Sequence, residues 1–209
     1  YNQFSEHVRY QLTQLRQLFS KVVFISNSQL DKSVAEQLKN DGLIDQFIQR
    51  QNQGYDFAAW HEGMSNIGFD NLTNYDSITA MNDTCFGPLW DMTPYFEKYE
   101  ADDSVDFWGM TNHRAIDAGH IFIDEHLQSY FMSYKKCLIE SSTFQDFWKN
   151  VESYKDVQKV IDNYETKYTK IFREAGFNYQ AVLNTVPIAD QFYHSNFTIH
   201  YPHVLLDNK

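Results

Sequence analysis

Short apolar runs that alternate with helical stretches most constrain the fold of this chain. Residues 21–25, Lys-Val-Val-Phe-Ile, form a β-branched run that predicts a strand buried on both of its faces. Residues 5–19 place apolar side chains from Val8 to Phe19 at helical spacing. Strands and helices that alternate in this way predict an α/β fold with a mainly parallel, twisted sheet and helices on both of its faces.

The same patterns predict the remaining elements. Further strands are expected at residues 44–48, 77–81, 106–110 and 130–134. Further helices are expected at residues 31–40, 56–66, 94–99, 144–151 and 164–175, and Gly176 is suited to end the last of them. The sequence shows no internal repeat and no linker, so we expect a single domain over residues 1–209.

Length and charge limit the classes of function. A chain of 209 residues has the size of one α/β domain. Its net charge of -11 argues against a nucleic-acid-binding surface, which needs basic residues to release counterions from phosphate. An acidic protein can still bind a nucleotide diphosphate when a divalent cation stands between the two sets of anions.

The sequence has neither a long apolar run nor a cysteine framework. A membrane span needs about 18 or more apolar residues in succession. We therefore expect no span, no signal peptide and a cytoplasmic location, including the inner face of the membrane. Cys85 and Cys137 lie far apart and predict no disulfide framework. The abrupt start at Tyr1 and the end at Lys209 lead us to expect that the sequence is part of a longer one.

A polar segment follows the predicted strand 77–81 directly. Asn82, Asp83 and Thr84 lead into a turn that a Gly-Pro pair closes. Ligands of α/β sheets bind beyond the carboxyl ends of the strands. A carboxylate there could hold Mg²⁺ or Mn²⁺ and so neutralise a sugar-nucleotide diphosphate. The alternative is an Asx-turn, in which the side chain bonds the local backbone, and the segment alone leaves both open.

Two other polar segments invite similar interpretations. The turn Ser26-Asn27-Ser28 follows the first predicted strand. The segment 50–60 combines Arg50, Gly54 and Asp56 with aromatic residues ahead of an apolar helix face. Arg50 could pair with a phosphate or with Asp56, and Gly54 would let the backbone approach a ligand. Asp56 could instead be the N-cap of the helix.

A carboxylate stands at the start of the last predicted helix. Glu165 follows Tyr164, and Thr169 lies one turn further on. A carboxylate at a helix N-terminus is a common structural arrangement, because the helix dipole stabilises it. The same position suits a general base that deprotonates a sugar hydroxyl. His113 and His120 do not predict a dedicated zinc site, because the chain lacks the usual zinc-ligand spacing.

Taken together, several runs of this sequence resemble one known family. The runs occur in the order of the family and cover roughly residues 10 to 180. Gly-Tyr-Asp-Phe at 54–57 and Asn-Asp-Thr-Cys-Phe-Gly-Pro at 82–88 are the most specific. The others are at residues 21–28, 50–60, 106–111, 126–131, 144–148 and 164–169. The family is the rhamnan synthesis protein F family, bacterial glycosyltransferases of cell-wall and capsular polysaccharide assembly.

The resemblance implies a GT-A-like fold. A nucleotide-sugar-binding part at roughly residues 1–110 would join an acceptor and catalytic part at roughly residues 111–209 without a linker. It also implies an inverting hexosyltransferase, most simply a rhamnosyltransferase that uses dTDP-L-rhamnose. The acceptor would be a glycan or lipid-linked glycan, that is, a growing cell-wall or capsular polysaccharide.

The resemblance also implies roles for individual residues. Asp83 takes the place of the metal-binding acidic motif, with one carboxylate where Asp-x-Asp has two. Glu165 takes the place of the base, and Asp106, Asp117 and Glu125 are rivals for that role. The expected substrate-binding residues are Ser26, Asn27, Ser28, Arg50, Asn52, Gly54, Tyr55, Asp56, Asn82, Thr84, Trp108, His126 and Gln128.

Two other functions compete with the transferase. The first is a non-catalytic nucleotide-sugar-binding module within a larger polysaccharide synthase. It would share the donor pocket but lack a base carboxylate that reaches the anomeric carbon from the far side. The second is a hydrolase, which would need two cooperating carboxylates across one glycosidic bond. The resemblance argues against the hydrolase.

Overall fold

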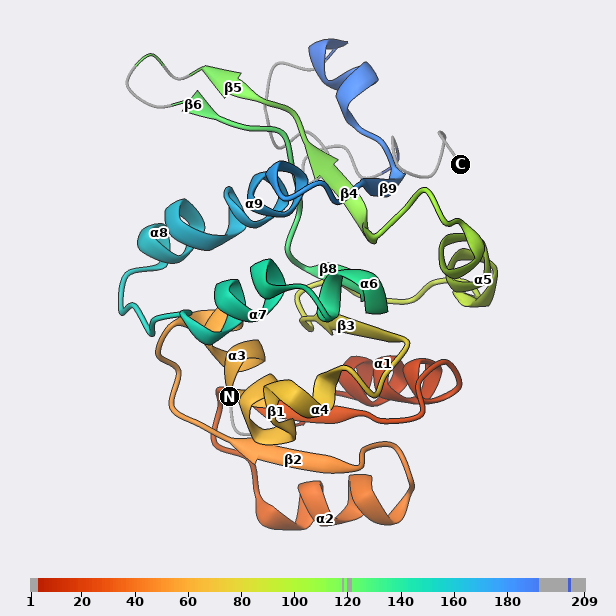
Figure 1. Ribbon diagram of the computed structural model, residues 1–209. Coiled ribbons are helices and arrows are strands. Elements are labelled where there is room, and N and C mark those ends of the chain that lie inside the picture. Colours follow the sequence, from red (N-terminus) through yellow and green to blue (C-terminus); the bar gives the residue numbers. More distant parts are fainter. Residues whose placement is uncertain (1–3, 118, 120–121, 192–202, 204–209) are drawn as a thin grey trace.

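A computed structural model describes residues 4–117, 119, 122–191 and 203 of the chain. The strands are β1 (Val23–Ser26), β2 (Gln46–Gln49), β3 (Ser77–Met81), β4 (Phe107–His113), β5 (Ile116–Asp117), β6 (Phe122–Ile123), β7 (His126–Leu127), β8 (Phe131–Lys135) and β9 (Tyr179–Leu183). Strands β1 and β2 form a parallel pair, and β5 and β6 an antiparallel one. The other strands form one sheet in the order β3-β8-β4, with β7 and β9 also paired to β4 (Figure 1).

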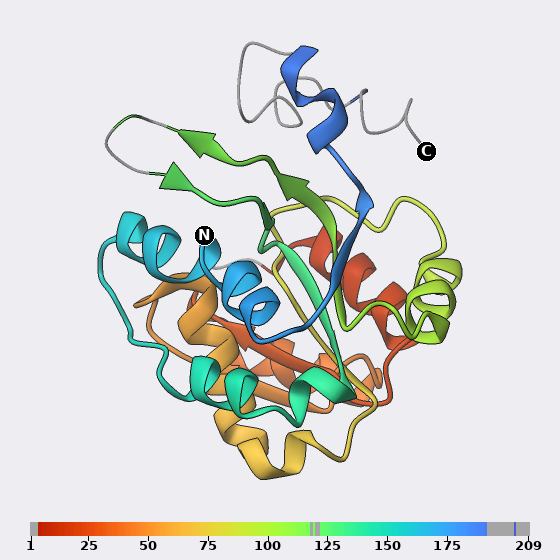
Figure 2. The same cartoon turned by 45° about the horizontal axis from the view of Figure 1, so that its top comes forward.

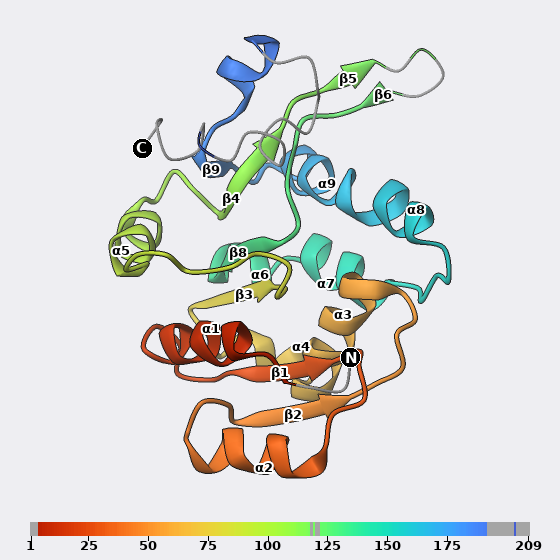
Figure 3. The same ribbon diagram turned by 180° about the vertical axis from the view of Figure 1, so that it is seen from behind.

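Helices cover both sides of these strands. The α-helices are α1 (Glu6–Arg16), α2 (Lys32–Asn40), α3 (Tyr55–Ile67), α4 (Phe69–Leu72), α5 (Thr93–Ala101), α6 (Lys136–Ile139), α7 (Ser142–Lys149), α8 (Val157–Val160) and α9 (Tyr168–Glu174). A π-helix (Ile161–Glu165) and a 3-10 helix, η2 (Val186–Gln191), complete the described elements. Helices α3 and α7 face the viewer in Figure 1, whereas α1 faces the viewer in Figure 3, from behind. None of the helices in the described ranges combines the length and apolar character that crossing a membrane requires.

The predicted α/β class is confirmed, but the sheet is mixed rather than mainly parallel. Strand β8 runs antiparallel to both β3 and β4, so β3 and β4 point the same way. The reason is the path of the chain after β4. It passes through the β5–β6 hairpin and returns along β4 as β7 and β8, without a crossover helix. Figure 2 shows the hairpin and η2 projecting beyond the carboxyl end of β4.

Most predicted elements lie within a few residues of their expected positions. The exception is the helix predicted at 164–175. The structure has α9 from Tyr168 to Glu174, preceded by the π-helix that ends at Glu165. Gly176, predicted to end this helix, follows its C-cap with a φ of 96°, a conformation that favours glycine. Strand β9, which pairs with β4 in parallel, was not predicted from the sequence.

The largest cluster of buried side chains joins α3 to the late helices. Phe57 and Trp148 are 2% and 0% exposed, and their stacked rings have centroids 5.7 Å apart. Phe57 also stacks on Tyr164, with centroids at 5.5 Å. Full burial of one such side chain contributes about 1.5–3 kcal/mol. This packing holds Asp56, next to Phe57, on the same side of the molecule as Glu165, next to Tyr164.

Gly54 sets the start of α3. Its φ is 74°, and its N–H donates to the carbonyl oxygen of Tyr154 at 2.8 Å. A Cβ atom at this position would lie 2.5 Å from the Cβ of Ala58 and 2.8 Å from the Cα of Ser153. The glycine therefore lets the loop before α3 approach the segment after α7. The close neighbour of Gly54 is protein backbone, in contrast to the ligand that we expected there.

Gly54→Ala should destabilise the fold more than Gly42→Ala. Gly42 has a similar φ of 69° but nothing within 4 Å of a Cβ. Its replacement should cost about 1–2 kcal/mol, for the backbone conformation alone. Gly54→Ala should cost about 1–3 kcal/mol more, because of the overlap with Ser153. Urea unfolding of both variants measures the difference, and equal losses would contradict a close contact at Gly54.

Candidate functional site

The candidate site lies at the carboxyl ends of β1 and β3. The backbone N–H of Asn82, directly after β3, donates to the carbonyl oxygen of Tyr130 at 3.2 Å. The backbone N–H of Ser129 in turn donates to Oε1 of Glu165 at 3.4 Å. These two bonds bring the turn after β3, the segment before β8 and the π-helix to one edge of the molecule.

Asn82 organises the turn after β3. Its Oδ1 accepts from the Thr84 backbone N–H at 3.2 Å and from the Thr84 hydroxyl at 2.6 Å, which forms an Asx-turn. Its Nδ2 donates to Oδ2 of Asp56 at 2.8 Å. The structural alternative for this segment therefore holds for Asn82. It does not use Asp83, the residue expected to bind a metal.

Asp83 is the exposed carboxylate of the site. Its side chain makes no hydrogen bond or ion pair within the described ranges, although its carbonyl oxygen accepts from Nε2 of His7 at 3.3 Å. No group of three or more His, Cys, Asp or Glu side chains suited to a metal occurs among the described residues. A cation at Asp83 would thus need water and ligand oxygens for the rest of its coordination shell, as Mg²⁺ commonly does.

Asp56 lies in the same region, and its pKa is raised. It is not the N-cap of α3, as the sequence suggested, because Gly54 holds that position and Asp56 lies in the first turn. Burial raises the pKa of Asp56, and the nearby charges of Asp83 and Glu165 raise it further. The hydrogen bond from Asn82 partly offsets this increase. Asp56, Asp83 and Glu165 therefore share one electrostatic environment.

Glu165 is the last residue of the π-helix. The backbone N–H of Thr166 donates five residues back to the carbonyl oxygen of Ile161, at 3.0 Å. Glu165 is half-buried and bonds Ser129, and it is not at a helix start as predicted. Single-turn π-helices occur frequently at functional sites. Thr169, one turn further on, is fully buried and accepts from the Leu127 backbone N–H at 3.1 Å, so its role is structural.

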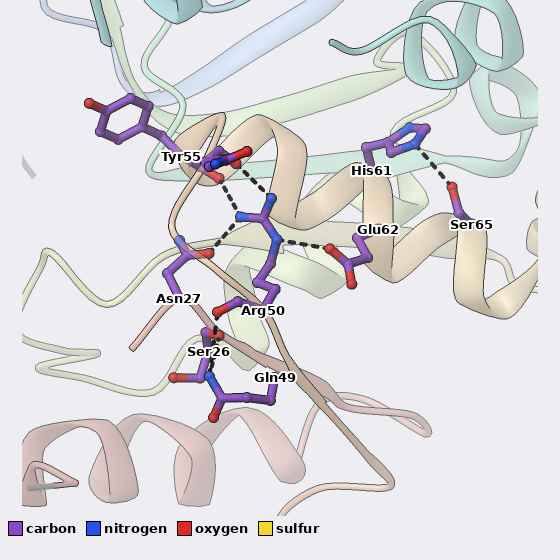
Figure 4. A network of polar contacts seen from close by, with 9 residues as sticks. Ser26, Asn27, Gln49, Arg50, Tyr55, His61, Glu62 and Ser65 are labelled. Carbon is purple, nitrogen blue, oxygen red and sulfur yellow. Dashed lines mark hydrogen bonds and ion pairs between the residues drawn. The ribbon is translucent and has the colours of Figure 1, made fainter. Parts of the chain in front are cut away.

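Arg50 holds the first turn of the site in place. Its guanidinium donates to Oε2 of Glu62 at 2.9 Å and to Oδ1 of Asn27 at 2.6 Å (Figure 4). It also donates to the carbonyl oxygens of Tyr55 at 3.4 Å and Gln53 at 2.6 Å. The side chain is only 9% exposed. These bonds satisfy most of its donors within the protein. The described residues show no ion pair between Arg50 and Asp56, and the pairing of Arg50 with a phosphate stays a prediction.

Two residues that support the site were missed from the sequence. Gln49 donates to the carbonyl oxygen of Ser26 at 3.2 Å (Figure 4). It also donates to the carbonyl oxygen of Ser28 at 2.7 Å, and the two bonds shape the turn after β1. Glu62, in α3, forms an ion pair with Arg50, which lies between β2 and α3. Gln49 ends β2, beside the predicted turn Ser26-Asn27-Ser28, and only this position could have indicated its role from the sequence. Glu62 lies within a helix and gave no such signal.

His113, His126 and Gln128 lie near the carboxyl end of β4. His113 and His126 stack with ring centroids 5.3 Å apart. Burial lowers the pKa of His113, and the neighbouring His126 lowers it further. Gln128 accepts from the Thr111 hydroxyl at 2.7 Å, and this hydroxyl also meets the Tyr130 hydroxyl at 2.8 Å. Of the two predicted residues, His126 belongs to β7, and Gln128 lies between β7 and β8, next to Ser129, which bonds Glu165.

Two predicted site residues lie elsewhere. Trp108 is 0% exposed and stacks on Tyr99 in the core beneath α5, so it cannot contact a substrate as expected. Asp106 lies at the amino end of β4, where its Oδ2 accepts from the Asn178 backbone N–H at 2.8 Å. This end of the strand is opposite the site, which removes Asp106 as a catalytic candidate. Asn52 is exposed in the loop before α3, and Tyr55 is the first residue of that helix.

Glu125 and Asp117 are the two remaining alternatives to Glu165 as the general base. Oε1 of Glu125 accepts from Asn112 at 3.0 Å and from the Tyr179 hydroxyl at 2.5 Å. Asp117 lies in the β5–β6 hairpin and accepts from the Gly119 backbone N–H at 2.8 Å. Both carboxylates therefore have structural partners. His120, from the histidine-containing loop, lies outside the described residues.

The described chain is thus a mixed α/β protein with an acidic polar site at the carboxyl ends of its strands. Residues 22–209 match the model of the rhamnan synthesis protein F family. The chain belongs to that family, which confirms the resemblance seen in the sequence. The description of the family associates its members with the synthesis of rhamnan, a polysaccharide.

Curated relatives extend beyond the length of this chain. The "Uncharacterized protein y4gN" of Sinorhizobium fredii is 29% identical over 169 residues, which are 78% of this chain and 42% of the relative. The "Virulence protein VirA" of Vibrio anguillarum is 25% identical over 164 residues, 77% of this chain and 50% of the relative. The chain therefore spans about half the length of the curated relatives it matches. No solved structure matches it.

Asp56→Asn should stabilise the fold at neutral pH. The raised pKa of Asp56 means that the folded state binds this proton more tightly than the unfolded chain. Stability is therefore lost as the pH rises from 3.8, the ordinary pKa of an aspartate side chain, through the raised pKa of Asp56 in the folded state. The asparagine carries no charge and keeps an oxygen that can accept from Asn82. Its urea midpoint should exceed that of the wild type at neutral pH and converge with it toward pH 3.8.

The exposed Asp103 provides the control for this measurement. Asp103→Asn removes the same charge outside the site, and its effect should be small at every pH. A wild-type midpoint equal to or above that of Asp56→Asn at neutral pH would contradict the proposed cost of the Asp56 charge.

Proposed function

We propose that this chain is an inverting glycosyltransferase that moves a sugar from a nucleotide-diphosphate donor to a growing polysaccharide. The observation that carries the proposal is the shared environment of Asp56, Asp83 and Glu165 at the carboxyl ends of the strands. Ligands of α/β proteins bind at this edge. The description of the family, rhamnan synthesis protein F, supports rhamnose as the sugar. A dTDP-L-rhamnose donor and a GT-A-like arrangement of the site are further parts of the proposal.

The donor would bind beside the turns after β1 and β3. Ser26, Asn27 and Ser28 form the first turn, and Asn82 and Asp83 belong to the second. The Ser26 hydroxyl donates to the carbonyl oxygen of Ser28, and Oδ1 of Asn27 accepts from Arg50. The Asn27 side-chain NH2 group, the Ser28 side chain and exposed backbone would be left for the nucleobase. A divalent cation at Asp83 would neutralise the diphosphate and stabilise it as a leaving group.

Glu165 would act as the general base. Its carboxylate takes the proton of the acceptor hydroxyl while the acceptor oxygen bonds to the anomeric carbon of the donor. The bond from that carbon to the diphosphate oxygen breaks, and the electron pair leaves with the diphosphate. Attack from the face opposite the leaving group inverts the configuration. One carboxylate suffices for this reaction, whereas retaining hydrolysis needs two.

A non-catalytic nucleotide-sugar-binding module is the second candidate. Such a module would bind the nucleotide sugar at the same turns. Neither Asp83 nor Glu165 would then take part in a reaction. The position of Glu165 favours the transferase, because its Oε1 accepts one backbone N–H and its Oε2 has no hydrogen bond within the described residues. The acceptor would be a glycan or a lipid-linked glycan that is presented at the inner face of the membrane.

A nucleotide diphosphate with Mn²⁺ should raise the thermal midpoint of the protein. At about 100 times the dissociation constant the expected stabilisation is about 2.7 kcal/mol. For a domain of this size the midpoint should rise by roughly 5–10 °C. dTDP should act more strongly than UDP or GDP, and Asp83→Asn should abolish the part that depends on Mn²⁺. Asp103→Asn is the matched control. An unchanged thermal midpoint with all three nucleotides would contradict a donor site.

Glu165→Gln should lower the transfer rate by about 10²–10⁴-fold. Glutamine keeps an oxygen that can accept from Ser129, so the fold and the nucleotide-induced shift should remain. The control is Glu174→Gln, at the exposed end of α9. Transfer is measured as release of nucleotide diphosphate in the presence of acceptor. Near-normal transfer by Glu165→Gln would remove Glu165 as the base and favour the binding-module alternative.

A further inference from the structure

Strands β1 and β3 point the same way but do not pair. Both arrows run in the same direction in Figure 3, and α1 lies across the space between them. Strand β1 pairs with β2 and β3 pairs with β8, and no hydrogen bond among the described residues joins β1 to β3. A cavity of about 490 Å³ lies there, lined by both strands, by α1 and by α3. Its polar residues Ser26 and Asp83 lie at the carboxyl end.

The backbone of β1 presents unpaired groups to this cavity. The carbonyl oxygens of Val22 and Ser26 accept from the N–H groups of Gln46 and Arg50 in or beside β2, at 3.3 and 3.0 Å. Even-numbered residues of β1 therefore direct their backbone groups toward β2. Because these directions alternate along a strand, Val23 and Ile25 direct theirs to the opposite edge, toward β3.

The backbone of β3 presents a matching edge. The N–H of Asn82 donates to Tyr130, and the carbonyl oxygen of Asp76 accepts from Lys136 at 2.8 Å, both toward β8. Odd-numbered residues 77, 79 and 81 therefore point their backbone groups away from β8. The carbonyl oxygen of Met81 accepts from the Trp60 indole at 3.2 Å. The described residues provide no hydrogen-bond partner for the backbone of Ser77 or Thr79 on this edge.

These two edges fit a peptide strand better than a small ligand. Between the edges the cavity is walled by apolar side chains, among them Leu12 and Leu15 of α1 and Met64 of α3. Buried backbone groups need hydrogen-bond partners at regular spacing, and each one left unpaired costs about 1–3 kcal/mol. An extended chain offers donors and acceptors along both of its sides, about 4.8 Å from each neighbour. A nucleotide sugar offers no such row.

The position of α1 indicates where such a strand would come from. His7 and Gln11, in the first turns of α1, bond the carbonyl oxygens of Asp83 and Asn82 at 3.3 and 3.4 Å. Helix α1 therefore begins at the carboxyl end of β3 and leads back to the amino end of β1. A parallel strand in the cavity would end where α1 begins. Strand, α1 and β1 would then form a β-α-β unit like that of β1, α2 and β2.

We propose that residues preceding Tyr1 in the complete protein form an apolar β-strand that fills this cavity and pairs with both β1 and β3. The result is one continuous sheet, in the order β2, β1, the added strand, β3, β8, β4 and β9. Its carboxyl end lies between the turn Ser26-Asn27-Ser28 and the turn after β3. This proposal does not depend on the reaction that the site catalyses.

Amide hydrogen exchange of the complete protein tests this arrangement. The outward-facing amides of Ile25, Ser77 and Thr79 should exchange at least about 100-fold more slowly than an unstructured chain. The amides of Ile78 and Ala80, which face β8, are internal controls from the same strand. Nuclear Overhauser contacts from the Thr79 amide should lead to residues encoded upstream of Tyr1.

Four results would overturn the proposal. The outward-facing amides could exchange at intrinsic rates while Ile78 and Ala80 stay protected. The Overhauser contacts could lead to Val23 and Ile25, which would mean that β1 and β3 pair directly. Protection could increase with protein concentration, which would indicate a strand from a second copy. The gene could also encode too few residues before Tyr1 for a strand. Nucleotide binding is measured separately, so none of these results decides the proposed transferase activity.

Discussion

The hydrogen bond from Asn82 to Asp56 joins the two sides of the candidate site. A half-buried carboxylate needs a donor to replace the water it has lost, and Asn82 supplies one at 2.8 Å. The same side chain closes the turn through Thr84. One asparagine thus ties the start of α3 to the end of β3. The aromatic packing of Phe57 against Trp148 and Tyr164 holds α3 in the position that makes this bond possible.

The electrostatics of the site limit what it can bind unaided. Asp56, Asp83 and Glu165 share one region, and the guanidinium of Arg50 is committed to Asn27, Glu62 and two backbone carbonyl oxygens. A diphosphate that enters would meet more negative than positive charge. Its binding would then need a cation between the anions. In the proposed reaction one of these carboxylates would also accept the proton of the acceptor hydroxyl, so the acidity of the site would hinder donor binding but assist deprotonation of the acceptor.

Local patterns predicted the elements well but not the direction of every strand. No helix was expected between the strands at 106–110 and 130–134, and a connection without a helix permits an antiparallel return. The prediction of a mainly parallel sheet overlooked that absence. The residues Asp106 and Trp108 were misjudged for a related reason. They belong to a run that resembles the family, but Asp106 lies just before β4 and Trp108 lies in its amino half, whereas the site lies at carboxyl ends of strands.

The sequence by itself determined the alternation of strands and helices, the polar turn at Asn82 and membership of the family, because each depends on neighbouring residues. The tertiary structure alone decided that Glu165 lies near Asp56, that Arg50 supports the turn at Asn27, and that β1 and β3 stand apart. These relations join segments far apart in the chain. They arise from the burial of aromatic side chains and from the need to satisfy buried polar groups, and no local pattern encodes either of them.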